Sequence, residues 1–459
     1  MPQRDTIFAL STCYGKSGIA IIKISGPNAL KALQNLSFKK NPSERVATLG
    51  KIYKKNGEII DEVIVIYFPK NHSYTGEDII ELQTHGGIAI INSIFYELNS
   101  FDYLRLATNG EFTRVALENN KISLNKAESL IELINSESEY QRKIAIRNYN
   151  GELEQSYLSW RNDMIELLSL SEAYIDFPDD LLDETELEKL NQRIVKLKDE
   201  FEKNIKFFSS ANKLMNGINI CIAGSTNVGK STLMNFLSKA DTSIISNIKG
   251  TTRDIVKTKI EILGIPVILQ DTAGIRITSD EIENIGIEKG KHAIKNSDII
   301  IFMLDANDLL NLDIIIEAKK WLNTDSKVLI YVNKIDLLNN YAPLKENLIK
   351  QLKSIDFKYE DLLFLSLKSN KFDQIIFQNI ERILNYFMPS SDANLVTNIR
   401  HQNKLENCNN YLSNALNANI LELKAEELRA SAKELGLLLG DINTEEILDK
   451  IFSSFCIGK

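Results

Sequence analysis

Hydrophobic positions follow three successive patterns along the chain, and each pattern predicts a different kind of structure. To about residue 118, short β-rich runs are separated by turns, and Asn56-Gly57 lies between two of these runs. Both residues tolerate positive φ, so the pair is a hairpin signal. We therefore expect an α+β region over residues 1–118.

From residue 123 to about residue 211, apolar positions recur at steps of three and four, which places them along one face of a helix. This spacing predicts a long helix or a helical hairpin. Because the pattern lasts only about three heptads, we expect the seam of an intramolecular bundle rather than a free coiled coil. The stripe consists of Leu187, Leu190, Ile194, Leu197, Phe201, Ile205 and Phe208.

Between residue 217 and about residue 387, short apolar runs such as INICIAG and DIIIFMLD alternate with helical patterns. Buried strands followed by helices predict βαβ units and a mostly parallel sheet. After Pro389 the helical pattern returns. We expect a discontinuous helical domain at residues 119–212 and 385–459, with an α/β domain at 213–384 inserted into it.

Composition, the N-terminal sequence and net charge restrict the possible classes of protein further. The 459 residues are 44% hydrophobic and 25% charged, no apolar run reaches the length of a membrane span, and the N-terminus lacks the layout of a secretion signal. We expect a cytoplasmic protein without membrane segments. The net charge of −8 argues against nucleic-acid binding by a whole-protein positive field, but it leaves room for a local basic patch.

Cysteine and histidine spacing excludes two further classes of protein. Cys13, Cys221, Cys408 and Cys456 are far apart, and the four histidines add no metal-ligand spacing. Disulfides and structural zinc are therefore not expected.

The segment GSTNVGKS, residues 224–231, fits G-x-x-x-x-G-K-[ST] and lies between a predicted strand and a predicted helix. Its glycines allow backbone N–H groups to surround a phosphate. Lys230 would place a cation against the β- and γ-phosphates, and the Ser231 hydroxyl would ligate Mg²⁺. This context predicts a P-loop, Ras-like α/β domain. The nucleotide-binding residues expected here are Asn227, Val228, Gly229, Lys230, Ser231 and Thr232.

Three further motifs follow in the order expected for such a domain: GTTRD, DTAG and NKID. Thr252 is suited to ligate Mg²⁺ and sense the γ-phosphate, Asp271 to hold the water shell of the metal, and Gly274 to donate its N–H to that phosphate. The expected binding residues are Gly250, Thr251, Thr252, Asp271, Thr272, Ala273, Gly274, Asn333, Lys334 and Asp336.

Asp336 is the residue expected to select the base of the bound nucleotide. Its carboxylate can accept two parallel hydrogen bonds from guanine, and adenine offers no such donor pair, so we expect GTP rather than ATP. Ser366, Leu367 and Lys368 resemble the fifth GTPase motif, usually Ser-Ala-Lys, with Leu367 as a departure.

The position directly after the D-x-x-G motif is Ile275, where Ras-type GTPases carry a water-positioning Gln. Hydrolysis must then use another group, a cation or a partner. The acidic candidates downstream are Asp280, Glu281 and Glu283, and the alternative is that all three only solvate a loop.

Over essentially all 459 residues, the chain resembles the MnmE (TrmE) family of tRNA-modification GTPases. The distinctive segments besides the GTPase motifs are SYTGEDIIELQTHGG (73–87), NGEFTRVALENNKISLNKAESL (109–130), AYIDFPDD (173–180) and IFSSFCIGK (451–459). The resemblance implies a homodimer that works on tRNA with an FAD-containing flavoprotein, MnmG, in a heterotetramer. The product implied is an aminomethyl or carboxymethylaminomethyl group at C5 of the wobble uridine, U34, with a 5-formyl- or 5,10-methylene-tetrahydrofolate as the one-carbon source.

The resemblance also implies roles for particular residues. In the family, GTPase domains meet across K⁺ ions, and Asn227, Ser246, Ile248 and Thr251 match the potassium ligands, within a segment that also includes Asn247 and Lys249. Glu283 matches the acid that orients the attacking water. In the N-terminal folate-binding and dimerisation domain, the matching folate positions are Lys23, where relatives have Arg, Glu81, Lys121 and Lys459.

The terminal FCIGK carries a thiol, Cys456. Lipidation fits poorly, because a prenylation box favours an aliphatic residue where Gly458 stands. The tail has apolar residues that favour docking over fraying, so we expect it to lie beside the folate pocket, with Lys459 touching the cofactor. Cys456 is then either a nucleophile or a packed side chain.

Two other classes share the GTPase motifs. A ribosome-assembly GTPase of the Era or Der type predicts a KH-like module or a second P-loop, and neither is found. A self-assembling GTPase of the dynamin or septin type predicts membrane or filament elements, against which the net charge and the lack of a basic amphipathic helix count.

Overall fold

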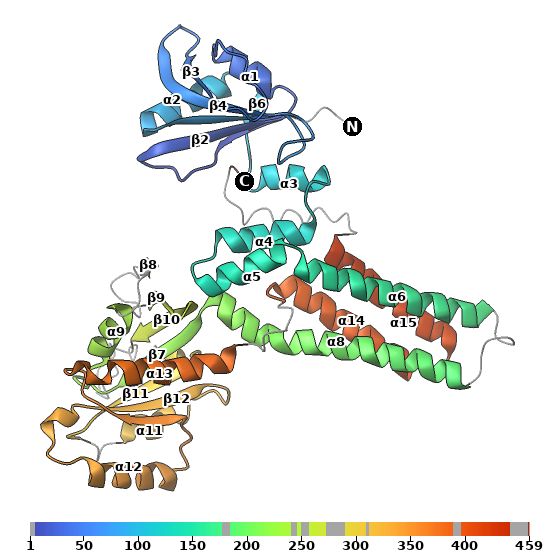
Figure 1. The fold of residues 1–459 in the computed structure, drawn as a ribbon. Helices are drawn as coiled ribbons and strands as arrows, with labels where there is room; N and C mark the ends of the chain where they lie inside the picture. Colours follow the sequence, from blue (N-terminus) through green and yellow to red (C-terminus); the bar gives the residue numbers. More distant parts are fainter. Residues whose placement is uncertain are drawn as a thin grey trace, which may run out of the picture. The chain divides into compact units, whose positions relative to one another are not determined.

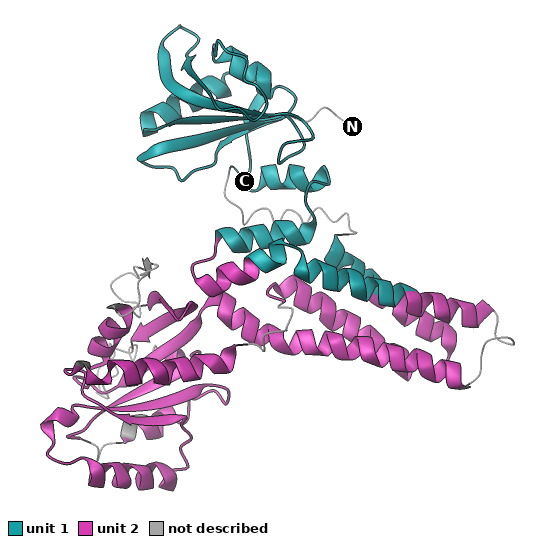
Figure 2. Cartoon of the chain, viewed as in Figure 1, with its two compact units in different colours: residues 1–134, 146–165, 432–459 teal, residues 135–145, 166–431 magenta. Residues whose placement is uncertain are grey.

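The computed structural model describes residues 5–176, 184–239, 246–248, 257–271, 290–308, 312–388, 396–440 and Gly458. It divides into two compact units (Figure 2). Unit 1 comprises residues 1–134, 146–165 and 432–459, and unit 2 comprises residues 135–145 and 166–431.

Unit 1 contains a six-stranded sheet in the order β3-β4-β5-β2-β1-β6 (Figure 1). Neighbouring strands are antiparallel except for β1 and β6, which are parallel. Helices α1 and α2 bury apolar side chains against the sheet in one core cluster. The elements are β1 Thr6–Leu10, β2 Ser17–Ser25, α1 Ala29–Asn35, β3 Thr48–Tyr53, β4 Ile59–Phe68, β5 Ile79–Gly86, α2 Ile88–Asn99, β6 Leu104–Leu106, α3 Glu111–Glu118 and α4 Leu124–Ile134.

The predicted hairpin is confirmed. Strands β3 and β4 pair antiparallel on either side of Asn56-Gly57, and Gly57 has φ of +85°. The Gly57 N–H donates to the Lys54 carbonyl at 2.9 Å, which closes the turn. The α+β character expected for this part of the chain is also confirmed.

Unit 2 contains a seven-stranded sheet in the order β13-β12-β11-β7-β10-β9-β8. Strands β13 to β10 are parallel, and β9 is antiparallel to both of its neighbours. The mostly parallel sheet was predicted correctly. The strands are β7 Ile218–Gly224, β8 Ser246–Ile248, β9 Lys257–Ile262, β10 Ile265–Asp271, β11 Ile299–Asp305, β12 Lys327–Asn333 and β13 Asp361–Phe364.

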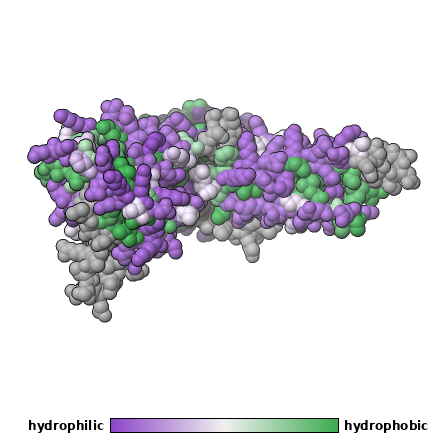
Figure 3. All heavy atoms as spheres, turned by 90° about the horizontal axis from the view of Figure 1, so that it is seen from below, coloured by the Kyte–Doolittle hydropathy of each residue, from purple (hydrophilic) through white to green (hydrophobic). Residues whose placement is uncertain are grey.

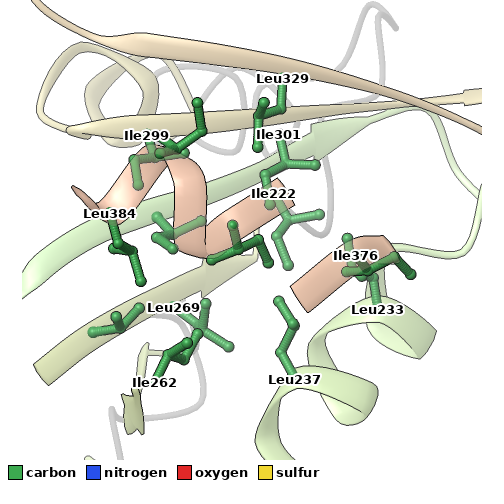
Figure 4. Close-up of a cluster of buried hydrophobic side chains, with 14 of the residues drawn as sticks. Ile222, Leu233, Leu237, Ile262, Leu269, Ile299, Ile301, Leu329, Ile376 and Leu384 are labelled. Carbon is green, nitrogen blue, oxygen red and sulfur yellow. The ribbon is translucent and has the colours of Figure 1, made fainter. Parts of the chain in front are cut away.

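Helices that pack against the seven-stranded sheet complete its hydrophobic core. Figure 4 shows Leu233 and Leu237 of α9 and Ile376 and Leu384 of α13 directed toward side chains of the strands, including Ile301. The helical elements are α9 Lys230–Lys239, α11 Asp313–Ala318, η1 Ile335–Leu337, α12 Ala342–Ser354, η2 Asn370–Phe372, α13 Asp373–Leu384 and η3 Asn385–Phe387.

The predicted helical stripe lies on α8, Glu184–Asn216, which packs against α14, Ile399–Asn417. The stripe residues Leu190, Ile194 and Phe201 are at most 1% exposed. An intramolecular seam was therefore the correct interpretation. The other long helices are α5 Glu139–Tyr149, α6 Glu152–Asp176 and α15 Leu421–Leu439, and each of these three has residues in both units.

Among the helices that the structure describes, none combines the length and the hydrophobicity needed to cross a bilayer. On the face drawn in Figure 3, hydrophobic positions are interspersed among hydrophilic ones.

Candidate functional site

The P-loop connects the end of β7 at Gly224 to the start of α9 at Lys230. Two of its residues have backbone angles that suit glycine or asparagine: Gly229 has φ of +105° and Asn227 has φ of +62°. A Cβ atom at Gly229 would lie 2.5 Å from Nδ2 of Asn333, so this glycine is required by close approach as well as by conformation.

Lys230 is only 7% exposed, and its Nζ donates to the carbonyl oxygens of Gly224 and Ser225 at 2.9 and 2.7 Å. Burial lowers the pKa of this ammonium group, and the nearby charge of Asp271 opposes that shift. The loop therefore holds a largely desolvated cation at the beginning of a helix. A phosphate would meet that cation together with the N–H groups of the helix start.

Ser231 and Asp271 supply oxygen atoms beside this cation. The Ser231 Oγ donates to the Asp271 carboxylate at 3.4 Å, and Asp271, the last residue of β10, is 8% exposed. A hydroxyl and a carboxylate at this separation suit Mg²⁺, which prefers hard oxygen ligands and retains several waters. These residues fit the metal predicted from the motifs. In the described part of the chain, no group of three or more His, Cys, Asp or Glu side chains forms a metal site of its own.

Asn333 links two of the predicted motifs. Its Nδ2 donates to the Val228 carbonyl at 2.8 Å, and its Oδ1 accepts from the Leu367 N–H at 3.0 Å. The side chain is 5% exposed, so both bonds are shielded from water. Asn333 thus connects the P-loop to the fifth motif, a role that the motif alone did not reveal.

Lys334 and Asp336 follow β12. The Lys334 Nζ pairs with the Asp305 carboxylate at 2.6 Å. Burial favours the neutral acid, but the hydrogen bonds from Lys334 and Asn307 outweigh it and keep the pKa of Asp305 below its usual range. Asp336 is exposed, so its carboxylate is accessible to a guanine base. The predicted fifth motif follows β13, where Ser366 is buried and Lys368 is exposed.

Several predicted residues fall outside the described residues. For the nucleotide and potassium sites these are Lys249, Gly250, Thr251, Thr252, Thr272, Ala273, Gly274 and Glu283, and for the tail they are Cys456 and Lys459. Ser246, Asn247 and Ile248 form strand β8, which pairs with β9. Asn227 is exposed in the P-loop.

A second site lies in unit 1, where Lys23 of β2 and Glu81 of β5 are register partners. The Lys23 Nζ lies 3.7 Å from the Glu81 carboxylate, and both side chains are partly exposed. They line a cavity of about 260 Å³, whose wall is otherwise mostly apolar. The remaining lining residues are Phe68, Tyr74, Ile79, Phe112, Leu130 and Gly458.

Gly458 brings the end of the chain to this cavity. Its carbonyl accepts a hydrogen bond from Ser11 Oγ at 3.0 Å, and its φ is +98°. A Cβ atom here would lie 2.2 Å from the Leu10 carbonyl oxygen, so only glycine fits without movement. Gly458 thus lies at the cavity that Lys23 and Glu81 line.

Lys121, the third predicted folate residue that the structure describes, contacts the backbone near the cavity rather than Lys23 or Glu81. Its Nζ donates to the Asn71 carbonyl at 2.8 Å, and it is not among the residues that line the cavity. The aromatic lining residues Phe68, Tyr74 and Phe112 were not predicted. The only signal for them was that Tyr74 and Phe112 lie in the two distinctive segments at 73–87 and 109–130.

The arrangement can therefore do two kinds of chemistry. The loops at the seven-stranded sheet can hold a nucleoside triphosphate with its metal. The cavity in unit 1 can hold a planar polar ligand, because it combines apolar walls with one cation and one carboxylate.

Comparisons with known proteins match nearly the whole chain. The family described as GTP-binding protein TrmE N-terminus matches residues 6–121, and the family described as MnmE helical domain matches residues 124–456. A tRNA modification GTPase MnmE of Wolbachia sp. subsp. Brugia malayi is 39% identical, with 99% of each chain covered. Its counterpart in Rickettsia rickettsii (strain Sheila Smith) is 40% identical over 99% of this chain and 100% of that protein.

A solved structure of Aquifex aeolicus Era with GDP and AlF4⁻ is 24% identical to the chain. It covers 42% of this chain and 66% of that one, with a TM-score of 0.30. The full-length relatives and the two family matches decide the assignment: the chain belongs to the MnmE family of tRNA modification GTPases.

Proposed function

We propose that this GTPase acts on tRNA together with an FAD-containing flavoprotein of the MnmG type. In this proposal it adds an aminomethyl or carboxymethylaminomethyl group to C5 of the wobble uridine, U34. A 5-formyl- or 5,10-methylene-tetrahydrofolate supplies the one-carbon unit. Family membership favours this function over the ribosome-assembly and self-assembling alternatives.

The observation that carries the folate part is the cavity in unit 1. Glu81 would accept hydrogen bonds from a pterin ring, and Lys23 would meet the anionic glutamate tail. The apolar walls suit a flat ring, and Gly458 brings the terminal segment within reach. In this proposal Lys459 touches the cofactor and Cys456 lies near the one-carbon unit. Lys121 would approach from outside the cavity.

At the nucleotide site, Lys230 binds the β- and γ-phosphates and Asp336 selects guanine. Ser231 and Thr252 hold Mg²⁺, which neutralises phosphate charge when bound. The Asn333 bridge keeps the P-loop and the fifth motif at a fixed separation, so that base and phosphates are bound together.

Hydrolysis is proposed to depend on K⁺ and on pairing of two GTPase domains in a homodimer. Asn227 supports this, because an exposed amide oxygen in the P-loop is a fitting ligand for a large monovalent cation. Ser246, Ile248 and Thr251 complete the proposed ligand set, and Glu283 orients the attacking water.

The proposed domains are residues 1–118, 119–212, 213–384 and 385–459.

The test is mass spectrometry of wobble uridines in tRNA from cells that lack this protein, with and without a restoring copy. Loss of the C5 modification, restored by the wild-type gene, is the expected result. Unchanged modification would refute the proposal. GTP turnover in K⁺ and in Na⁺ tests the second part, and equal rates would refute potassium dependence.

A further inference from the structure

One edge of unit 1 concentrates lysines around aromatic rings. The Lys31 Nζ lies 4.4 Å from the centroid of the Tyr103 ring, and the Lys55 Nζ lies 5.3 Å from that of Phe101. The two rings are stacked, with centroids 5.7 Å apart and planes only 4° from parallel. Two lysines from separate elements, α1 and the β3–β4 hairpin, are therefore held by one aromatic pair.

The cluster continues along the same edge. The Tyr53 N–H donates to the Leu36 carbonyl at 2.9 Å, which joins the end of β3 to the end of α1 (Figure 1). The Lys39 Nζ lies 6.0 Å from the Tyr53 ring, and the Lys40 Nζ donates to a β3 carbonyl. We call this set the lysine–aromatic surface: Lys31, Lys39, Lys40, Lys54, Lys55, Tyr53, Phe101 and Tyr103.

Acidic groups offset only part of the charge of the five lysines. Glu58 pairs with Lys54 at 2.8 Å, and Asp102 is exposed between the two stacked rings in the sequence. Glu97 is 6% exposed and accepts from the backbone N–H of Lys55. The other four lysines of the surface are exposed and have no carboxylate partner among the described residues. In a chain of net charge −8, this is a local positive surface.

The type of contact follows from the burial of the rings. Phe101 is 6% exposed and Tyr103 is half-buried, so neither presents an open face on which a base could stack. The accessible groups are ammonium ions, which bind phosphate oxygens without reading base edges. The surface is therefore suited to a polyanionic backbone.

We propose that the lysine–aromatic surface binds the phosphate backbone of tRNA. This inference rests on the proposed function, in which tRNA is the substrate. The surface positions the tRNA and adds affinity that depends on salt, whereas the choice among tRNAs is made elsewhere.

The test uses the full-length protein and an unmodified tRNA transcript with uridine at the wobble position. The variant carries Lys31→Gln, Lys39→Gln and Lys55→Gln together. Its tRNA affinity is expected to fall about tenfold near 0.1 M salt, and the slope of log affinity against log salt to become shallower by roughly 2. GTP turnover without tRNA should match wild type, because none of the three lysines belongs to the nucleotide site.

Two matched variants keep the result interpretable. Lys345→Gln, Lys350→Gln and Lys353→Gln remove the same charge from exposed positions of α12 and should leave affinity unchanged. Arginine at residues 31, 39 and 55 preserves charge and cation–π contact, so Lys31→Arg, Lys39→Arg and Lys55→Arg together should retain binding.

Wild-type affinity in the glutamine variant, or an equal loss in the α12 variant, would overturn the inference. So would loss of binding to phosphatidylserine vesicles with unchanged tRNA affinity, since the surface would then serve a membrane. If the wild-type protein itself binds no tRNA, the proposed function fails together with this inference. If the wild-type protein binds tRNA and the triple glutamine variant binds it equally well, the inference alone fails.

Discussion

The seven-stranded sheet holds its functional groups at strand ends, whereas the six-stranded sheet holds Lys23 and Glu81 within strands. In the parallel part of the larger sheet, Gly224, Asp271 and Asn333 are the last residues of their strands and meet at one edge. In the smaller sheet, a cross-strand pair projects from one face into a cavity. Loops at an edge can surround phosphates with backbone N–H groups, whereas a sheet face offers only side chains.

If the nucleotide site and the cavity in unit 1 act independently, removing the buried cation at the P-loop should abolish GTP hydrolysis and leave folate binding unchanged. Lys230→Ala is expected to lower kcat for GTP by about 100- to 1,000-fold, the usual cost of one preorganised charge-stabilising donor. Tetrahydrofolate affinity should be unchanged. Steady-state GTP turnover and folate titration measure the two effects.

Lys295→Ala is the control for this comparison, because Lys295 is exposed on a helix of the same unit. It should leave turnover at the wild-type level. Retention of more than about a tenth of wild-type turnover in Lys230→Ala would contradict the assigned role of Lys230.

The reverse experiment disturbs the cavity and spares the P-loop. Gly458→Ala places a Cβ atom 2.2 Å from the Leu10 carbonyl at a φ of +98°, a strain of about 1–3 kcal/mol that should displace the tail. We expect tetrahydrofolate affinity to fall about tenfold or more. GTP turnover should remain at the wild-type level.

Gly57→Ala provides a matched control for this strain. Gly57 also has positive φ, +85°, but a Cβ atom there meets nothing within 4 Å. It should cost some stability and no folate affinity. Equal folate binding by Gly458→Ala and wild type would show that the position of Gly458 does not contribute to folate affinity.

A smaller change addresses the cross-strand pair itself. Glu81→Gln removes the charge opposite Lys23 while keeping the size of the side chain, and we expect a three- to tenfold loss of tetrahydrofolate affinity. This loss corresponds to about 1 kcal/mol, the difference between a charged and a neutral acceptor of hydrogen bonds from the ligand. Isothermal titration of the variant measures it.

Glu62, an exposed residue of the adjacent strand β4, supplies the control, since Glu62→Gln changes the same charge on the same sheet. It should bind folate as wild type does. Lys23→Arg should also retain affinity if a cation is all that this position requires. A loss in Glu62→Gln equal to that in Glu81→Gln would indicate a general effect of charge.

This contrast also explains what the sequence could predict. The proximity of GSTNVGKS, DTAG and NKID was foreseeable, because each begins at or directly after the end of a strand of apolar residues, so order along the chain implies proximity at the sheet edge. The two hydrogen bonds of the Asn333 side chain were not foreseeable, because they depend on the separation of two loops. The strands and the α8 stripe were predicted from the pattern of apolar residues, and the hairpin from the Asn56-Gly57 pair.

The cavity in unit 1 depends on information that periodicity does not contain. Lys23 and Glu81 are brought together by the register of β2 on β5, and Gly458 reaches them from the other end of the chain. Family resemblance indicated both charged residues, but the aromatic walls and the position of Lys121 required the structure.

The smallest expected effect compares Lys230 with a second buried lysine, which has no phosphate site beside it. Lys424 is 3% exposed, and its Nζ donates to Asn191 Oδ1 at 2.9 Å and to the Ala415 carbonyl, both neutral acceptors. Burial lowers the pKa of this ammonium group. Below that folded-state pKa, the desolvated charge opposes folding.

Because the unfolded state binds the proton more tightly, stability should rise with pH between the lowered folded-state pKa and the unfolded value of about 10.4. Lys424→Met lacks the titrating group and should lose that rise with pH, although it also loses two hydrogen bonds. Urea unfolding followed by circular dichroism from pH 7 to 10 measures the difference between variant and wild type. Lys433→Met, at an exposed position of α15, should keep the wild-type pH dependence. Parallel curves of unfolding free energy against pH for all three proteins would show that burial of the Lys424 charge does not destabilise the fold.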